Sequence, residues 1–235
     1  FAEEQRALGI GVIGYHSFLQ SKMIPFESMD AKYWNNLIFK TIDEQALEAS
    51  KKLAVLFGEP ELLNGYGIRN ITRTAVAPTT SSSEIMGESP CIEPWTSNYM
   101  VQKLAKGNFT TKNVFLMDLL KEKRKHTPAI LKDILMQGGS VQHLDFLSDH
   151  EKAVFKTFGE ISQMEIIIQA GQRQPYICQS QSLNLKIHAQ QPLKDVNALM
   201  IEAWKRKVKS LYYQRGTNPA QELRRNLLSC ASCAG

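Results

Sequence analysis

The stretch 28–59 constrains the fold of this chain more than any other part of the sequence. Its apolar residues recur at helical spacing over many turns, which predicts one long amphipathic helix. The apolar positions are Trp34, Leu37, Ile38, Ile42, Ala46, Ala49, Leu53 and Leu56. Gly58 and Pro60 end the pattern, as expected at a helix C-terminus.

Two shorter segments also carry helix signals. Thr127-Pro128 opens a predicted helix over 128–137, because proline is well placed at the first helical position. Ser148 and Glu151 form a capping box, which predicts the start of a second long helix over 149–171.

A last helix is predicted from about 192 to 210, with Trp204 on its inward-facing side. Between the helices lie three short segments of extended character, 72–78, 140–147 and 175–188. Strands that alternate with helices indicate an α/β protein with mostly parallel strands.

After Tyr213 the sequence changes character. It becomes polar, contains Gly216 and Pro219, and offers little to bury. We therefore expect one folded domain over 1–213 and a mobile tail over 214–235.

Composition narrows the class of protein. Hydrophobic residues make up 43% of the 235 residues and charged residues 22%, as in ordinary globular proteins. No apolar run approaches the roughly 18 residues of a membrane span, and Glu3, Glu4 and Arg6 are unlike a signal peptide. Four cysteines are too few for a disulfide scaffold, so we expect a reducing, cytoplasmic setting and no membrane.

The net charge of +5 is mild, and its densest cluster is the run 121–126. No aromatic residues interleave there for base stacking. A solvated helix face is the better interpretation, so we expect no nucleic-acid partner.

The first candidate site is the stretch VAPTTSSSEIMG at 76–87. A short apolar strand leads through Pro78 into the hydroxyl residues 79–83 and then into a helical pattern. The unpaired N–H groups at a helix start, together with hydroxyl donors, suit a phosphate or diphosphate. A plain N-cap with redundant hydroxyls is the alternative.

The second candidate is the adjacent pair Tyr212 and Tyr213. Neighbouring side chains on a helix point about 100° apart, so these two rings can face each other only where the backbone has left the helix. A stacked pair of phenols is a reasonable carrier of an oxidising equivalent; two ordinary core or rim residues are the alternative.

The third candidate is the pair Cys230 and Cys233, close to the end of the chain. Zinc requires four ligands, and the other cysteines and the histidines are scattered. A dithiol that cycles to a disulfide needs only this pair. An accidental pair of small residues in a disordered end is the alternative.

Together these pieces resemble the C-terminal part of the large, catalytic subunit of class I ribonucleotide reductase. The matching segments follow the family order along nearly the whole chain, and the short PTTSSSEIMG segment resembles phage and bacterial members. The segments are LGIGVIG (8–14), RNITRTAVAPTTSSSEIMGESPCIEPW (69–95), QSQSLNL (179–185), WKRKVKSLYY (204–213) and CASCAG (230–235).

The resemblance implies a fold and a set of roles. The fold is the second half of a ten-stranded α/β barrel with surrounding helices, over 1–213. The implied activity converts ribonucleoside diphosphates to deoxyribonucleoside diphosphates. The residues that match the substrate-diphosphate loop are Pro78, Thr79, Thr80, Ser81 and Ser82.

The remaining roles concern electrons. Tyr212 and Tyr213 match the pair that relays a radical from a metal-containing small subunit, so this chain itself is expected to bind no metal or cofactor. Cys230 and Cys233 match the dithiol that re-reduces the active site and is itself reduced by thioredoxin or glutaredoxin.

The chain also departs from the family pattern. No Asn-x-Cys-x-Glu segment is present for the radical-bearing cysteine, and the sequence starts with Phe1 in a helical pattern. We therefore expect a split polypeptide or a piece of a longer one, active only with the N-terminal part of the large subunit. Cys91 and Cys178 are expected to be packed as small hydrophobic residues.

Two alternatives stay open at this stage. One is a non-catalytic interaction or regulatory fragment that retains the fold. The other is a zinc-dependent nucleic-acid module, supported only by the terminal cysteines and the basic run.

Overall fold

The structure is a computed structural model that describes residues 1–104, 107–188 and 190–216. Its centre consists of four extended segments that lie parallel to one another. Ile10 pairs with Thr74 and Val76 with Gln181, while strand β3 (Leu185–Ile187) pairs with strand β4 (Gln214–Gly216). The spatial order is thus 8–11, 72–76, 179–187 and 212–216, as in a segment of an α/β barrel.

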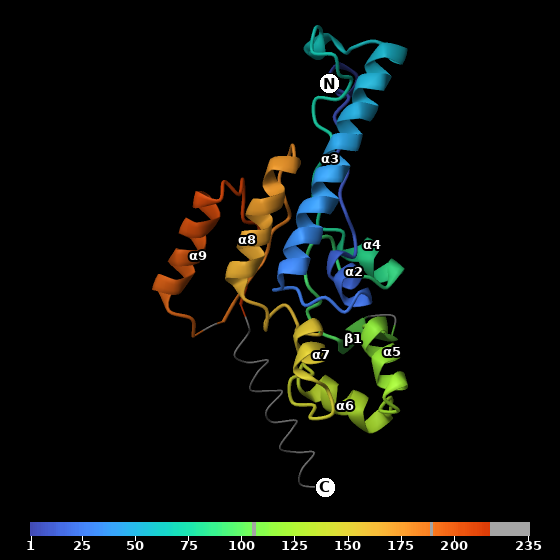
Figure 1. The fold of residues 1–235 in the computed structure, drawn as a ribbon, viewed down its shortest axis with the longest axis vertical. Helices are drawn as coiled ribbons and strands as arrows, with labels where there is room; N and C mark the ends of the chain where they lie inside the picture. Colours follow the sequence, from blue (N-terminus) through green and yellow to red (C-terminus); the bar gives the residue numbers. More distant parts are fainter. Residues whose placement is uncertain (105–106, 189, 217–235) are drawn as a thin grey trace.

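Three helices lie side by side against one face of these segments (Figure 1). They are α3 (Met29–Phe57), α8 (Gln163–Arg173) and α9 (Leu193–Lys205). Gly171 allows α8 and the end of α9 to pack closely, because a Cβ on Gly171 would lie 2.6 Å from the Cβ of Arg206, the residue after α9. A larger residue there would push the two helices apart.

The main core lies between these helices and the extended segments. It is built from buried apolar side chains that include Leu19, Phe26, Phe158, Ile167, Leu183 and Leu185. Helix α2 (Tyr15–Ser21) contributes to the same core and connects the first extended segment to α3.

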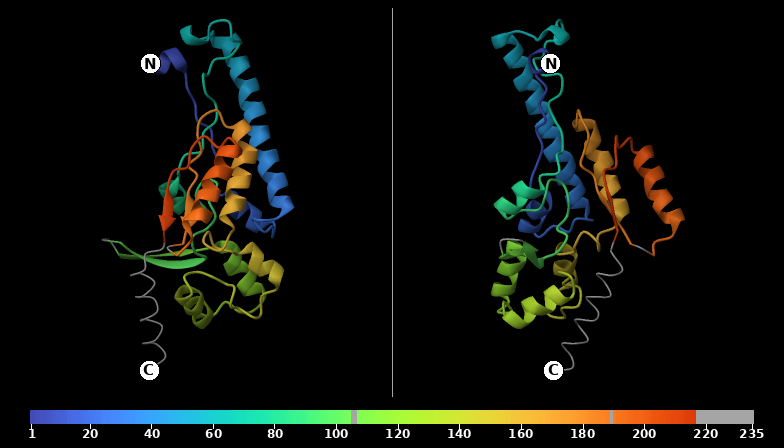
Figure 2. Two further views of the ribbon diagram at one scale, coloured as in Figure 1. Left: turned by 90° about the vertical axis from the view of Figure 1, so that its left-hand side faces the viewer. Right: turned by 180° about the vertical axis from the view of Figure 1, so that it is seen from behind.

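A smaller helical lobe lies at one end of the molecule (Figures 1 and 2). Its helices are α5 (Val114–Glu122), α6 (Pro128–Met136) and α7 (Asp149–Val154), which enclose a second apolar cluster around Leu116, Leu120, Ile134 and Phe155. An antiparallel hairpin of β1 (Tyr99–Leu104) and β2 (Gly107–Lys112) leads into this lobe.

The remaining elements are short. Helix α1 (Ala2–Gln5) begins the chain, and helix α4 (Thr80–Met86) follows the second extended segment. Two 3-10 turns cover Glu61–Leu63 and Gln174–Tyr176.

The helix predictions are confirmed in part. The long helix expected over 28–59 is α3, and the helix expected over 128–137 is α6, with Pro128 at its first position. The last helix ends at Lys205, five residues before the predicted end at 210.

The single helix predicted over 149–171 is wrong. The chain forms α7, then an irregular stretch over 155–162, then α8. Glu160 stabilises the non-helical turn between the two helices. Its carboxylate accepts hydrogen bonds from both the N–H and the hydroxyl of Thr157, 2.7 and 2.8 Å away. Phe155 and Phe158 are buried around the break, so the apolar stripe belongs to a loop.

Two further predictions are wrong. The segment 140–147 forms successive turns, since Leu144 N–H bonds to the carbonyl of Val141 and Leu147 N–H to that of Leu144. The side chains of Val141, Leu144 and Leu147 are all buried in the second apolar cluster. In successive turns, side chains three residues apart can point to the same side. Trp204, expected inward, is 78% exposed.

The extended segments 72–78 and 175–188 do supply parallel pairing, as predicted. The hairpin β1–β2 was not predicted and is antiparallel. The first three residues of the predicted tail, Gln214–Gly216, form strand β4, and the tail from 217 onward lies outside the described residues. Among the described helices, none has the length and apolar character to cross a membrane.

Candidate active site

The hydroxyl-rich turn lies at the carboxyl end of the second extended segment. Thr79 is the N-cap of α4, with φ of 48°, in the left-handed region. Its Oγ1 accepts a hydrogen bond from the N–H of Cys91 at 2.9 Å, which holds the turn in place. Pro78, Thr80, Ser81 and Ser82 are exposed around the start of the helix.

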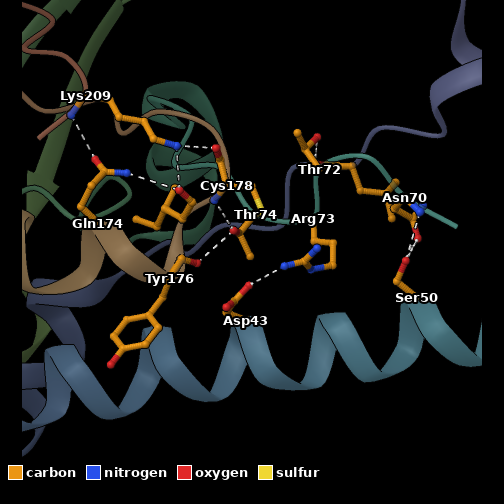
Figure 3. A network of polar contacts seen from close by, with 12 residues as sticks. Asp43, Ser50, Asn70, Thr72, Arg73, Thr74, Gln174, Tyr176, Cys178 and Lys209 are labelled. Atoms are coloured by element: carbon orange, nitrogen blue, oxygen red, sulfur yellow. Dashed lines mark hydrogen bonds and ion pairs between the residues drawn. The ribbon is translucent and has the colours of Figure 1, made fainter. Parts of the chain in front are cut away.

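A polar network fixes the strand that carries this turn (Figure 3). Arg73 forms an ion pair with Asp43 of α3, with 3.1 Å between Nη2 and Oδ1. The hydroxyl of Thr74 donates to the carbonyl of Tyr176 at 3.0 Å and accepts from the N–H of Cys178 at 2.9 Å. The second and third extended segments are therefore locked both to each other and to the long helix.

The predicted tyrosine pair is in contact. Helix α9 ends at Lys205, so Tyr212 and Tyr213 lie in extended chain, and their ring centroids are 4.3 Å apart at 53°. The pKa of Tyr212 is raised, first by its hydrogen bond with Tyr213 and then by the neighbouring phenol's charge. The two side chains are thus a hydrogen-bonded, tilted pair, 56% and 55% exposed in this chain.

A cavity of about 250 Å³ brings the turn and the tyrosine pair together. Pro78 lines it from the turn and Tyr212 from the pair. The other lining residues come from the extended segments and the approach to the pair: Val76, Ser180, Gln181, Ser182 and Ser210. Pro78 of the turn and Tyr212 of the pair thus line one cavity, where the carboxyl end of the second extended segment meets the starts of the third and fourth.

Glu93 and Asn184 adjoin the pair, and neither was singled out from the sequence. The side-chain amide of Asn184 donates through Nδ2 to Oε1 of Glu93, and its Oδ1 accepts from the N–H of Tyr213 at 2.9 Å. Burial raises the pKa of the Glu93 carboxyl, against the opposing charge of Arg215 and the bond from Asn184. Glu93 lies in IEPW and Asn184 in SLNL, and both stretches belong to the segments that resemble the reductase family. That resemblance was the sequence signal that could have identified them.

The cysteines divide into three cases. Cys91 is fully buried, and burial raises the pKa of its thiol to about 11, so it is packed as expected. Cys178 is only half-buried; burial acts to raise its pKa, but bonds with Thr74 and the charge of Arg73 outweigh it and lower the pKa. Cys230 and Cys233 lie outside the described residues.

Within the described ranges 1–104, 107–188 and 190–216, no group of three or more histidine, cysteine, aspartate or glutamate side chains could hold a metal ion. Around the tyrosine pair and the turn, the groups described above are phenols, hydroxyls, backbone N–H groups and the buried Glu93 carboxyl.

Known proteins resemble this chain along nearly its full length. The profile of the family described as ribonucleotide reductase, barrel domain, matches residues 2–63 and 59–214. The ribonucleoside-diphosphate reductase large subunit of Invertebrate iridescent virus 3 is 41% identical over 218 residues, which cover 91% of this chain and 35% of that protein. The large subunit of Danio rerio is 32% identical, over 93% of this chain and 32% of that protein.

Among solved structures, the Actinobacillus ureae class Id ribonucleotide reductase alpha subunit is similar, with a TM-score of 0.86 and 50% identity. The match covers 98% of this chain and 41% of that one. The chain thus spans about a third of the length of these two curated relatives.

Proposed function

Because this chain belongs to the ribonucleotide reductase barrel-domain family, we propose that it acts as the C-terminal component of a ribonucleoside-diphosphate reductase large subunit. The predicted fold class, the later part of the family's α/β barrel, is confirmed by the same matches. The proposed reaction replaces the 2′-hydroxyl of a ribonucleoside diphosphate by hydrogen. The observation that carries the proposal is the cavity shared by Pro78 of the turn and Tyr212 of the ring pair.

In this proposal the turn at 78–82 binds the diphosphate of the substrate. The first N–H groups of α4 have no partner within the helix, and the positive end of its dipole points the same way. The hydroxyls of Thr80, Ser81 and Ser82 are exposed and can donate to phosphate oxygens. Thr79 instead fixes the position of the turn, because its hydroxyl oxygen accepts the hydrogen bond from the N–H of Cys91.

Tyr212 and Tyr213 relay the oxidising equivalent. Each phenol gives up one electron and one proton when oxidised, and regains both from the next donor in the chain of transfer. A hydrogen-bonded pair suits this exchange, because the proton and the electron have the same short path. The oxidant enters from a small subunit, which holds the metal, so this chain needs none of its own.

Cys230 and Cys233 supply the reducing equivalents. Reduction of the ribose consumes two electrons and two protons, which is what a dithiol releases when it closes to a disulfide. The pair passes them by thiol–disulfide exchange to a disulfide in the active site and is reduced again by thioredoxin or glutaredoxin. Such cycling requires a reducing compartment, so we also propose the cytoplasm.

The remaining catalytic groups come from the N-terminal part of the large subunit. This chain lacks the Asn-x-Cys-x-Glu pattern of the radical-bearing cysteine. It also presents large apolar side chains to solvent along the first extended segment, where Leu8 and Ile10 are 46% and 47% exposed. A covering partner at that edge fits both observations.

The role of the tail is tested by changing Cys230→Ser and Cys233→Ser together in the complete large subunit, assembled with its small subunit. Turnover with thioredoxin should collapse, while one pre-reduced turnover per site survives. Because serine cannot form the disulfide, only re-reduction is affected.

The measurement is product per site, with and without a small-molecule dithiol that reaches the active site directly. Cys178→Ser is the matched control and should keep both quantities, because Cys178 is not among the residues that line the cavity. Equal loss of single and multiple turnover would contradict the assigned role of the tail.

A further inference from the structure

The backbone hydrogen bonds between the tyrosine pair and the third extended segment depart from the regular pattern of a parallel pair of strands. The N–H of Tyr212 donates to the carbonyl of Leu183 at 2.8 Å, and the N–H of Leu185 donates to the carbonyl of Tyr213 at 2.9 Å. In a regular parallel pair, a single residue lies between two such bonds. Here two residues, Tyr212 and Tyr213, lie opposite one residue, Asn184. This arrangement is a β-bulge.

The bulge explains how adjacent tyrosines come to touch. In a regular strand successive side chains point to opposite faces, so neighbouring rings cannot meet. An extra residue in one strand changes this alternation and re-aims a side chain. The rings of Tyr212 and Tyr213 accordingly lie 4.3 Å apart, although both belong to extended chain.

A bulge leaves one backbone N–H without a partner in the ladder, and here it is that of Tyr213. The side chain of Asn184 supplies the missing acceptor through Oδ1, at 2.9 Å. At its other end, Nδ2 of the same amide donates to Glu93. Asn184 is 2% exposed and Glu93 6%, so water does not compete for either bond.

Glu93 also determines which way the amide points. An asparagine amide has an acceptor end and a donor end, and a carboxylate offers only acceptors. With Nδ2 drawn to Glu93, Oδ1 must face the N–H of Tyr213. The reverse orientation would set two oxygens against each other and two donors against each other.

We propose that Asn184 is a positioning residue for the tyrosine pair: it holds the bulge that brings Tyr212 and Tyr213 into contact, and Glu93 orients its amide. The proposal rests on the proposed relay, because it assigns the groups that keep the relay aligned. Neither residue exchanges an electron. Their effect is on the distance and tilt of the two rings.

The test uses the complete large subunit with its small subunit, with 3-aminotyrosine in place of Tyr212, the tyrosine that lines the cavity, so that the radical must cross from Tyr213 to be trapped. This analogue is oxidised more easily than tyrosine and traps the radical, which electron paramagnetic resonance then counts. Asn184→Ala should lower the radical yield at least about tenfold, since small misplacements of reacting groups cost factors of this order. In the enzyme with native Tyr212, kcat should fall similarly while the KM of the substrate stays within about twofold.

Two further variants keep the outcome interpretable. Glu93→Gln retains the shape and one acceptor but no longer enforces the amide orientation, so the radical yield should fall about threefold, as for one weakened hydrogen bond. Should Asn184→Ala fail to fold, this near-isosteric change carries the test. Asn70→Ala is the matched control, because Asn70 is another buried amide that bridges two segments, Arg6 and Ser50, away from the pair. It should keep the wild-type yield.

The outcomes separate the two proposals. A radical yield in Asn184→Ala and Glu93→Gln equal to that of the parent would overturn the positioning role. No trapped radical in the parent with native Asn184 and Glu93 would instead overturn the relay itself.

Discussion

His16 is a neutral histidine at the centre of the main core. Its ring is fully buried against Phe26, with the ring centroids 5.5 Å apart. Its Nδ1 accepts a hydrogen bond from the N–H of Trp95 at 3.0 Å, which ties α2 to the segment that carries Glu93. Burial lowers the pKa of His16 to about 3, and the carbonyl of Val154 acts weakly in the opposite direction.

This pKa predicts a specific sensitivity to acid. Between pH 6.5 and about 3 the unfolded chain binds a proton at His16 that the folded protein does not, so stability falls as the pH falls through this window. At pH 5 the loss amounts to about 2 kcal/mol of the free energy of unfolding. His16→Asn, which keeps an acceptor for Trp95, should show a shallower pH dependence in urea unfolding followed by tryptophan fluorescence.

The exposed His126→Asn variant is the control for that experiment and should follow the wild type. Identical pH slopes for wild type and His16→Asn would show that His16 is not the group responsible.

At the scale of elements, the helix ends are the parts most directly encoded by local sequence. The capping box at α7 is complete: Oγ of Ser148 accepts from the N–H of Glu151, and the Glu151 carboxylate accepts from the N–H of Ser148 at 2.8 Å. Glu151 also pairs with Lys123, the C-cap residue of α5, 2.9 Å away. Ser162 begins α8 as well, but its side chain makes no capping bond.

This contrast predicts different costs for the same substitution. Ser148→Ala should lower the free energy of unfolding by about 1 kcal/mol, because an orphan N–H of the first turn loses its acceptor. Ser162→Ala should change it by less than about 0.5 kcal/mol. Thermal unfolding of the two variants side by side measures the difference, and equal destabilisation would contradict the assigned role of the box.

Structural features that depend on residues close in sequence were predictable, and those that depend on residues far apart in sequence were not. Caps and proline positions depend on neighbours in sequence, so α3, α6 and the start of α7 were predicted well. The break before α8 depends on a carboxylate that closes a turn, and the turns over 140–147 depend on a core assembled from other segments. Periodicity alone cannot distinguish such buried loops from helices or strands.

The candidate site follows the same rule. The turn at 78–82 and the tyrosine pair were recognisable because each is a contiguous run of residues. Asn184 was missed because its partners, Glu93 and Tyr213, are 91 and 29 positions away in sequence. The parallel pairing of the third and fourth extended segments brings Asn184 to Tyr213, and the loop after α4 brings Glu93 to Asn184.

At the scale of the whole molecule, the chain exposes large apolar side chains in more than one place. Large apolar side chains are exposed at the end of α3 and on α4: Val55, Leu56, Phe57, Ile85 and Met86. These residues lie in two separate places, because the end of α3 and helix α4 are far apart in the fold (Figure 1). Together with Leu8 and Ile10 of the first extended segment, they are apolar surface that the proposed contact with the N-terminal part of the large subunit would have to cover.

The most direct test of the account is ribonucleoside-diphosphate reduction by the complete large subunit and its small subunit, with and without Tyr213→Phe. Phenylalanine keeps the ring but has no O–H to oxidise, so the variant should bind the substrate diphosphate normally and form less than about 1% of the wild-type product, because an essential transfer step is lost. Wild-type rates in the Tyr213→Phe enzyme, or no reduction by the wild type itself, would contradict the central claim.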